Sequence, residues 1–208
     1  MPRWMYGVVG FALLWVIWTK VIKPTPDVSQ ITTQQGVQVV ALESYEGSFR
    51  VLSREDYNLG REAEYSPMDI AVGWGEMANP QVYKQIDISQ GNRWYYWRVD
   101  HAPPIPFNAI SVQSANMHLV PANASVAAKM KKIKKDDLVY LKGALIEIQA
   151  QDGWRWKSSL SREDTGNGAC ELMRVDSIVW QYIKFLINVL NRYRSVHITA
   201  QFYSKILE

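Results

Sequence analysis

The sequence predicts a mostly β protein of the α+β class, with an N-terminal transmembrane helix, an OB-like small Greek-key barrel and a C-terminal amphipathic helix. Three observations support this prediction: an apolar run opens the chain, short strand-like segments surround one clear helix in its centre, and a second apolar segment follows. We divide the chain into a transmembrane signal anchor (1–23), a linker (24–35), a β-rich OB-like domain (36–176) and an amphipathic helix with a tail (177–208).

The first segment has the length and composition of a membrane-spanning helix. Residues 4–18 contain no charged side chain. Extended to residue 22, the run makes a helix of roughly 28 Å, close to the hydrocarbon core of about 30 Å. Aromatic rings lie toward both of its ends, where lipid headgroups favour them. Residues 19–23 offer no small-residue cleavage site, so we favour an uncleaved signal anchor over a cleaved signal peptide.

The formal net charge of +3 comes from the anchor segment, which contains Arg3, Lys20 and Lys23 and no acid. The rest of the chain therefore has 20 basic and 20 acidic residues. A neutral remainder lacks the surplus of cations that nucleic-acid binding needs, so no nucleic-acid partner is predicted. Five lysines within residues 129–135 are followed directly by two aspartates, and we expect them to form a solvated helix face. Basic residues flank the anchor on both sides, so charge does not decide its orientation.

Prolines and polar residues make 24–35 a tether between anchor and domain. Apolar and polar side chains then alternate, which predicts a strand from residue 36. Residues 49–52 either continue this strand or pair with it across a turn at Glu46 and Gly47.

Residues 65–70 have the pattern of a helix start. Ser66 is placed to cap the helix, Pro67 suits the first helical position, and Asp69 supplies the reciprocal acceptor. A further helical turn is predicted at residues 79–80, where an asparagine precedes a proline.

Residues 86–90 and 93–99 predict a β-hairpin around a turn at Gly91 and Asn92. The second strand carries four aromatic rings in succession at residues 94–97. Two interpretations follow: the strand is packed on both faces, or the rings form a platform for a base or a sugar.

The second half of the domain contains a strand at 110–120, a helix at 123–135 capped by Asn123, a strand at 138–150 bent at Gly143, and further strands at 154–160 and 170–175. Strands, then a helix, then a hairpin is the element order of an OB-type barrel, here with a helix and a hairpin inserted early. An unclassified α+β sheet fold is the alternative. The absence of a glycine-rich phosphate loop between strand and helix units argues against a dinucleotide fold or a P-loop enzyme.

Residues 178–193 predict the C-terminal helix, with Val179, Ile183, Leu186 and Leu190 along one side. This stretch is too short and too often interrupted by polar residues to span a bilayer. The helix is expected to dock on the barrel, to lie at the membrane surface, or to pair with a partner helix, including that of a second copy.

No metal and no cofactor is predicted. Cys170 is the single cysteine, which excludes an intrachain disulfide and a cysteine-based metal cluster. His101, His118 and His197 lie far apart, without the paired spacing of a zinc site.

The candidate catalytic side chains are Asn116, His118, Arg162, Asp164 and Cys170. A cysteine with a histidine and an orienting asparagine is a known nucleophilic arrangement. Residues 116 and 118 also share one face of a predicted strand. The opposing hypothesis is that Cys170 is a small buried hydrophobe and that His118 is a hydrogen-bonded structural residue.

Several phrases are distinctive: DIAVGWG at 69–75, the hairpin from ISQ at 88–90 to WY at 94–95, SANMHLVPA at 114–122, WRWKSS at 154–159 and GNGACE at 166–171. In these phrases residues 1–176 resemble a family of uncharacterised proteobacterial inner-membrane proteins with a single anchor and a β-rich soluble domain. That family has no assigned activity, so the resemblance implies a location, with the domain in the periplasm, and no reaction. The tail at 177–208 departs from the family pattern.

Together these observations predict a membrane-anchored structural or assembly accessory whose β-rich domain binds a protein or an envelope component. Its expected partners are the membrane, through residues 4–22, and a protein. The alternative is a membrane-anchored hydrolase or transferase with a His118/Asn116/Cys170 or an Arg162/Asp164 site. An enzyme requires these side chains to converge in one pocket, whereas a binding module requires an exposed apolar or aromatic patch.

Overall fold

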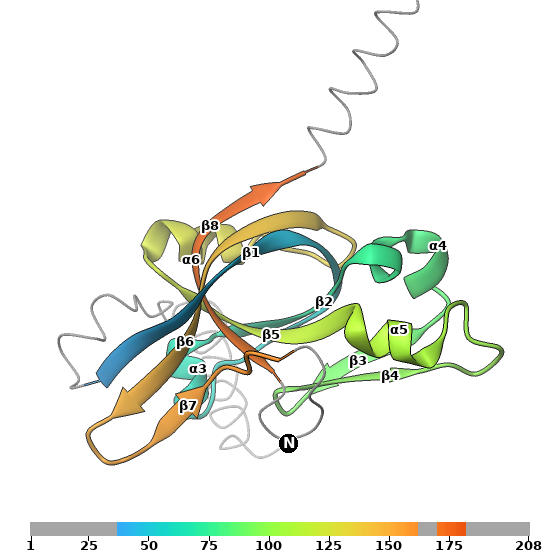
Figure 1. Cartoon of the computed structure of the whole chain (residues 1–208). Helices are drawn as coiled ribbons and strands as arrows, with labels where there is room; N and C mark the ends of the chain where they lie inside the picture. The colour runs from blue at the N-terminus through green and yellow to red at the C-terminus, as the bar shows by residue number, and fades with distance from the viewer. Residues whose placement is uncertain (1–36, 162–169, 182–208) are drawn as a thin grey trace, which may run out of the picture.

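The computed structural model describes residues 37–161 and 170–181, and they form a mostly β domain (Figure 1). The β-rich class predicted from the sequence is confirmed. The predicted anchor and linker, and residues 182–208 of the predicted C-terminal segment, lie outside the described residues. Within the described part, no helix is long and apolar enough to cross a membrane.

The strands are β1 (Val37–Asp56), β2 (Met68–Gly73), β3 (Asp87–Gly91), β4 (Trp94–Arg98), β5 (Ser114–Pro121), β6 (Leu138–Ala150), β7 (Arg155–Lys157) and β8 (Glu171–Trp180). The helices are α3 (Arg61–Tyr65), the 3-10 helix η2 (Gly75–Ala78), α4 (Pro80–Tyr83), α5 (Phe107–Val112) and α6 (Ala124–Met130).

Five strands close into a barrel in the order β1–β2–β5–β8–β6 and back to β1 (Figure 1). Strand β1 closes the ring because it is long enough to pair with β6 along residues 37–50 and with β2 along residues 50–56. All ring pairings are antiparallel except β5 with β8, which is parallel. Strand β7 adds to β6 outside the ring.

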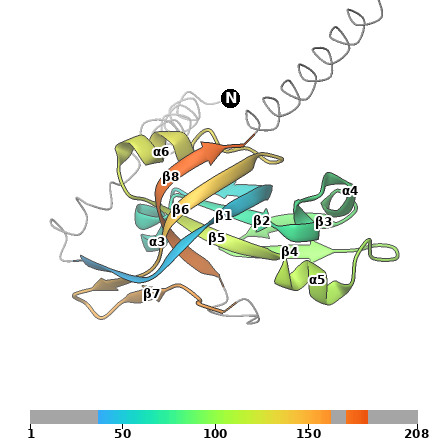
Figure 2. The same ribbon diagram turned by 45° about the horizontal axis from the view of Figure 1, so that its top comes forward.

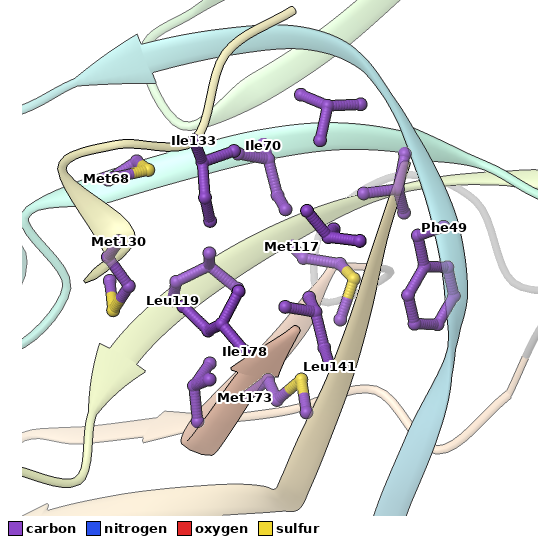
Figure 3. Close-up of a cluster of buried hydrophobic side chains, with 14 of the residues drawn as sticks. Phe49, Met68, Ile70, Met117, Leu119, Met130, Ile133, Leu141, Met173 and Ile178 are labelled. Atoms are coloured by element: carbon purple, nitrogen blue, oxygen red, sulfur yellow. The ribbon is translucent and has the colours of Figure 1, made fainter. Parts of the chain in front are cut away.

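Alternate side chains of the ring strands fill the barrel interior, as period-two side-chain geometry requires (Figure 3). Met117 and Leu119 of β5 meet Ile70 of β2 there, and Met130 of α6 closes one side. Asn123 caps α6 as predicted, since its Oδ1 accepts a hydrogen bond from the Val126 amide at 3.0 Å.

An insertion between β2 and β5 packs on the outside of the barrel (Figure 2). It contains η2, α4, the hairpin β3–β4 and α5, which lie together on one side of the molecule. Ile88, Tyr95 and Trp97 of the hairpin pack against Leu52 and Ala71 on the outer face of β1 and β2. Leu52 and Ala71 on the outer face are therefore as fully buried as the side chains inside the barrel.

The predicted helix start at residues 65–70 is wrong. Helix α3 ends at Tyr65, Ser66 is extended, and Met68 begins strand β2. The residue before a proline avoids the helical conformation, which favours extended backbone at Ser66. All six residues of β2 are buried, so the strand lacks the alternation that would have revealed it.

The strand predicted at 110–120 begins only at Ser114, because residues 107–112 form helix α5. The helix predicted from residue 178 is wrong over its first three residues, which end β8 and pair with β6. The predicted hairpin is confirmed, with its turn one residue later at Asn92 and Arg93, both of which have positive φ. The predicted bend at Gly143 is confirmed as a register shift, where a Cβ would meet the Arg174 carbonyl oxygen at 1.8 Å.

Candidate functional site

Asn116 and His118 lie on the outer face of β5, as the strand periodicity predicted, and each is 4% exposed. Cys170 lies immediately before β8 and is half-buried. Arg162 and Asp164 fall outside the described residues. The structure thus places three of the five candidates, all beneath or beside the hairpin β3–β4.

Asp69 is the fully buried acid at the centre of this region. It lies opposite His118 in the β2–β5 register. Its Oδ2 is 2.9 Å from His118 Nδ1, an ion-pair distance without the alignment of a hydrogen bond. Its Oδ1 accepts a hydrogen bond of 2.7 Å from Arg93 Nη1. A buried carboxylate is costly unless it is paired, and Asp69 is paired with a guanidinium.

Arg93 comes from the turn of the hairpin and joins it to the barrel. Its Nη2 donates to the Ser66 carbonyl at 2.8 Å, and its guanidinium carbon lies 3.8 Å from the centre of the Tyr57 ring. Its own amide donates to the Tyr57 hydroxyl at 3.0 Å. A non-glycine residue at φ +68° is uncommon, and these contacts offset its strain.

Asn116 holds the hairpin at a second point. Its Oδ1 accepts from Gln90 Nε2 at 2.7 Å, and its Nδ2 donates to the Arg93 carbonyl at 3.1 Å. Two residues before Asn116, on the same face of β5, the Ser114 hydroxyl lies 2.6 Å from the Tyr95 hydroxyl. Burial raises the pKa of Tyr95 to about 12. The inner face of the hairpin is thus fixed to β5 by a row of directional contacts.

These contacts divide the three candidates between two groups. Asn116 Nδ2 lies 3.8 Å from Cys170 Sγ, and that sulfur lies 3.9 Å from the Arg93 carbonyl oxygen. His118 contacts Asp69 and the Trp156 ring, whose centre is 5.0 Å from the imidazole centre. Cys170 thus shares its contacts with Asn116 and the hairpin turn, whereas His118 shares its contacts with Asp69 and Trp156.

A surface hollow of about 300 Å³ lies elsewhere, where β1 begins and β6 turns into β7. It is lined by Val37, Arg61, Glu64, Tyr65, Ala150, Gln151 and Asp152. Arg61 bonds both carboxylate oxygens of Asp152, at 2.7 and 3.0 Å, and this pairing lowers the pKa of Asp152. None of the three candidates that the structure describes lines this hollow.

The opposite face of the hairpin points away from the barrel. Trp94 and Tyr96 lie on it, across from Gly91 and Ser89, and Tyr96 is 53% exposed. Trp94 is half-buried and packs against none of the three core clusters. The second strand is therefore packed on one face, through Tyr95 and Trp97, rather than on both, and a platform for a base or a sugar on its other face stays a prediction.

Sequence reasoning missed Asp69 and Arg93 as site residues. Asp69 was assigned to a helix cap that does not form, and Arg93 was assigned only to a strand. Their relationship depends on the β2–β5 register and on the hairpin folding back, and neither leaves a local signal in the sequence. A bulky basic residue next to Asn92 in the turn is the one available hint, because such turns favour glycine.

Within the described ranges, no three His, Cys, Asp or Glu side chains are grouped to hold a metal ion. The chain matches no protein-family model, no curated protein and no solved structure.

Proposed function

We propose that the protein is a membrane-anchored accessory that binds a partner protein through the outward face of the hairpin β3–β4. The observation that carries this proposal is the division of the hairpin into two faces. One face is fixed to the barrel by Arg93, Gln90 and Tyr95, and the other carries the exposed Tyr96 and the half-buried Trp94. Aromatic residues on a rigid support are typical of interface hot spots.

We also propose that the barrel is of the OB type. In support, its strands follow the order of that fold, β5 and β8 are parallel, and α6 lies between β5 and β6 in the chain. OB domains bind oligonucleotides and oligosaccharides over their second and third strands. Here these are β2 and β5, whose outer face is covered by the hairpin, so a ligand is expected on the hairpin instead.

The proposal places the anchor at residues 4–22 in the bacterial inner membrane and the domain in the periplasm. Its support is the apolar run of the sequence and the resemblance of residues 1–176 to single-anchor proteins. The hydrolase or transferase alternative is less well supported, because Asn116 and His118 are each 4% exposed, Asn116 holds the hairpin and His118 lies against Asp69.

The binding face is tested by photo-crosslinking in living cells. In the full-length chain, Tyr96 is replaced by p-benzoyl-phenylalanine, and Val179, which is also 53% exposed but lies on strand β8, is replaced in a matched control. We expect one discrete protein adduct from position 96 and none from position 179. Adducts that are absent at 96, or identical at both positions, would contradict the proposed face.

A variant with Tyr96→Ser then separates binding from folding. Because the side chain is exposed, its loss should change the free energy of unfolding by less than about 0.5 kcal/mol. Co-purification of the crosslinked partner from detergent-solubilised membranes should nevertheless fall sharply. Unchanged co-purification would remove Tyr96 from the interface.

A further inference from the structure

A basic turn, defined as residues 129–135, comprises the end of helix α6 and the turn after it, and carries five exposed lysines: Lys129, Lys131, Lys132, Lys134 and Lys135. The sequence suggested that Asp136 and Asp137 balance this charge. In the structure, both aspartates instead contact groups other than these five lysine side chains. Asp136 accepts a 2.6 Å hydrogen bond from the Tyr83 hydroxyl and lies 3.8 Å from Lys84 Nζ.

Asp137 also has other partners. Its Oδ2 accepts a hydrogen bond of 2.7 Å from Trp180 Nε1 and one of 2.9 Å from the Lys134 backbone amide. In the described part of the chain, no carboxylate lies within ion-pair distance of any of the five lysine side chains. The turn therefore presents a local excess of positive charge on a domain that otherwise has more acidic than basic residues.

The basic turn is held rigidly on β1. Its buried Ile133 belongs to the barrel core. Arg54 Nη1 donates to the Lys131 carbonyl at 3.1 Å, and Arg50 Nη1 donates to the Asp136 carbonyl at 2.8 Å. Because the backbone is anchored on this inner side, the lysine side chains extend into solvent together.

The chain leaves the described domain beside this turn. Trp180 bonds Asp137, and the Gln181 amide donates to the Leu138 carbonyl at 2.9 Å. In sequence, residues 182–207 are rich in apolar side chains and contain Lys184, Arg192 and further bases but no acid. Apolar and basic residues in combination are typical of segments that bind at an anionic lipid surface.

We propose that the basic turn binds the anionic surface of the membrane in which the chain is anchored, an inference that rests on the proposed anchor. The proposed anchor would keep the domain close to that surface, since a flexible chain of 12 residues has a root-mean-square span of roughly 20 Å. Lipid is favoured over nucleic acid because the neighbouring chain is apolar as well as basic and the rest of the domain has no surplus of cations.

The test uses the full-length chain in nanodiscs of zwitterionic lipid, with or without about one-third phosphatidylglycerol. Lysines are acetylated briefly and quantified by mass spectrometry. In anionic discs the reactivity of the basic turn should fall at least about fivefold, and 0.5 M NaCl should restore it. Lys142, which lies 3.7 Å from a Glu46 carboxylate oxygen, serves as the internal reference and should change little.

Equal labelling of the basic turn in both lipids would overturn the proposal. Protection by a short DNA duplex in zwitterionic discs, without protection by anionic lipid, would overturn it in favour of nucleic acid. A variant with all five lysines changed to glutamine should lose binding to anionic vesicles, whereas a control with Lys84, Lys142 and Lys157 changed to glutamine should keep it. Matched thermal unfolding of both variants checks the fold.

A separate experiment tests the proposed anchor: the protein in zwitterionic vesicles is treated with alkaline carbonate, which does not extract a chain that spans the bilayer. If the chain is extracted, the anchor is wrong, and the basic turn is then judged by co-flotation of the free chain with anionic vesicles. Co-flotation that the glutamine variant loses supports the basic turn, and absent co-flotation contradicts it.

Discussion

The inner face of the β2–β5 pair carries Ile70, Met117 and Leu119, whereas its outer face carries Asp69 and His118. All five side chains are at most 4% exposed. The inner face is held by apolar packing, which depends on volume and tolerates changes of shape. The outer face is held by charge pairing and hydrogen bonds, which depend on the identity of each atom. Residues that are equally buried are thus stabilised by different interactions on the two faces.

The largest expected effect comes from removing a charge on the outer face while keeping its volume. Asp69→Asn leaves the Arg93 guanidinium, 2.7 Å away, without its buried counter-charge. Breaking a buried pair from one side costs about 3–5 kcal/mol. We expect a loss of about 3 kcal/mol in the free energy of unfolding, measured by urea titration of the full-length protein in detergent. A loss below about 1 kcal/mol would remove the distinction between the two faces.

The second expected effect is a pH dependence specific to the outer face. Burial raises the pKa of Tyr95 to about 12, whereas an unfolded tyrosine titrates near 10. The resulting stability is complete below pH 10 and is lost as the pH rises through 12. Between these values the wild type should lose about 2 kcal/mol more than Tyr95→Phe. Parallel curves for the two proteins would show that the hydroxyl is not buried as described.

The smallest expected effect is a change of shape on the inner face. Met117→Leu keeps the side chain apolar and of similar volume, so it should cost less than about 1.5 kcal/mol. The same urea titration compares it directly with Asp69→Asn. A cost equal to or above that of Asp69→Asn would reverse the proposed order of the two faces.

The same contrast explains what sequence reasoning could predict. Helix α6, the hairpin and the bend at Gly143 have local signals, namely a capping asparagine, a turn between aromatic and polar runs, and a glycine in an apolar strand. Strand β2 has none, because burial on both faces removes its alternation, and the Ser66–Pro67 pattern is equally suited to a helix start.

For the candidate site, periodicity predicted that Asn116 and His118 share a face, and the structure confirms it. Their partners could not be predicted in the same way. Asp69 reaches His118 only through strand register, and Arg93 reaches Asp69 only because the hairpin folds back over β5. Cys170 was placed correctly near a strand start, but which groups it contacts depends on the parallel pairing of β5 with β8.

The central claim is that the polar residues beneath the hairpin are structural, and alkylation of Cys170 tests it most directly. Iodoacetamide is added to the full-length protein at pH 7, and the rate is compared with free cysteine and with the His118→Gln variant. We expect a rate no faster than that of free cysteine and no change in the variant, because the histidine faces Asp69. A rate far above that of free cysteine that the variant abolishes would contradict the account and identify a catalytic thiol.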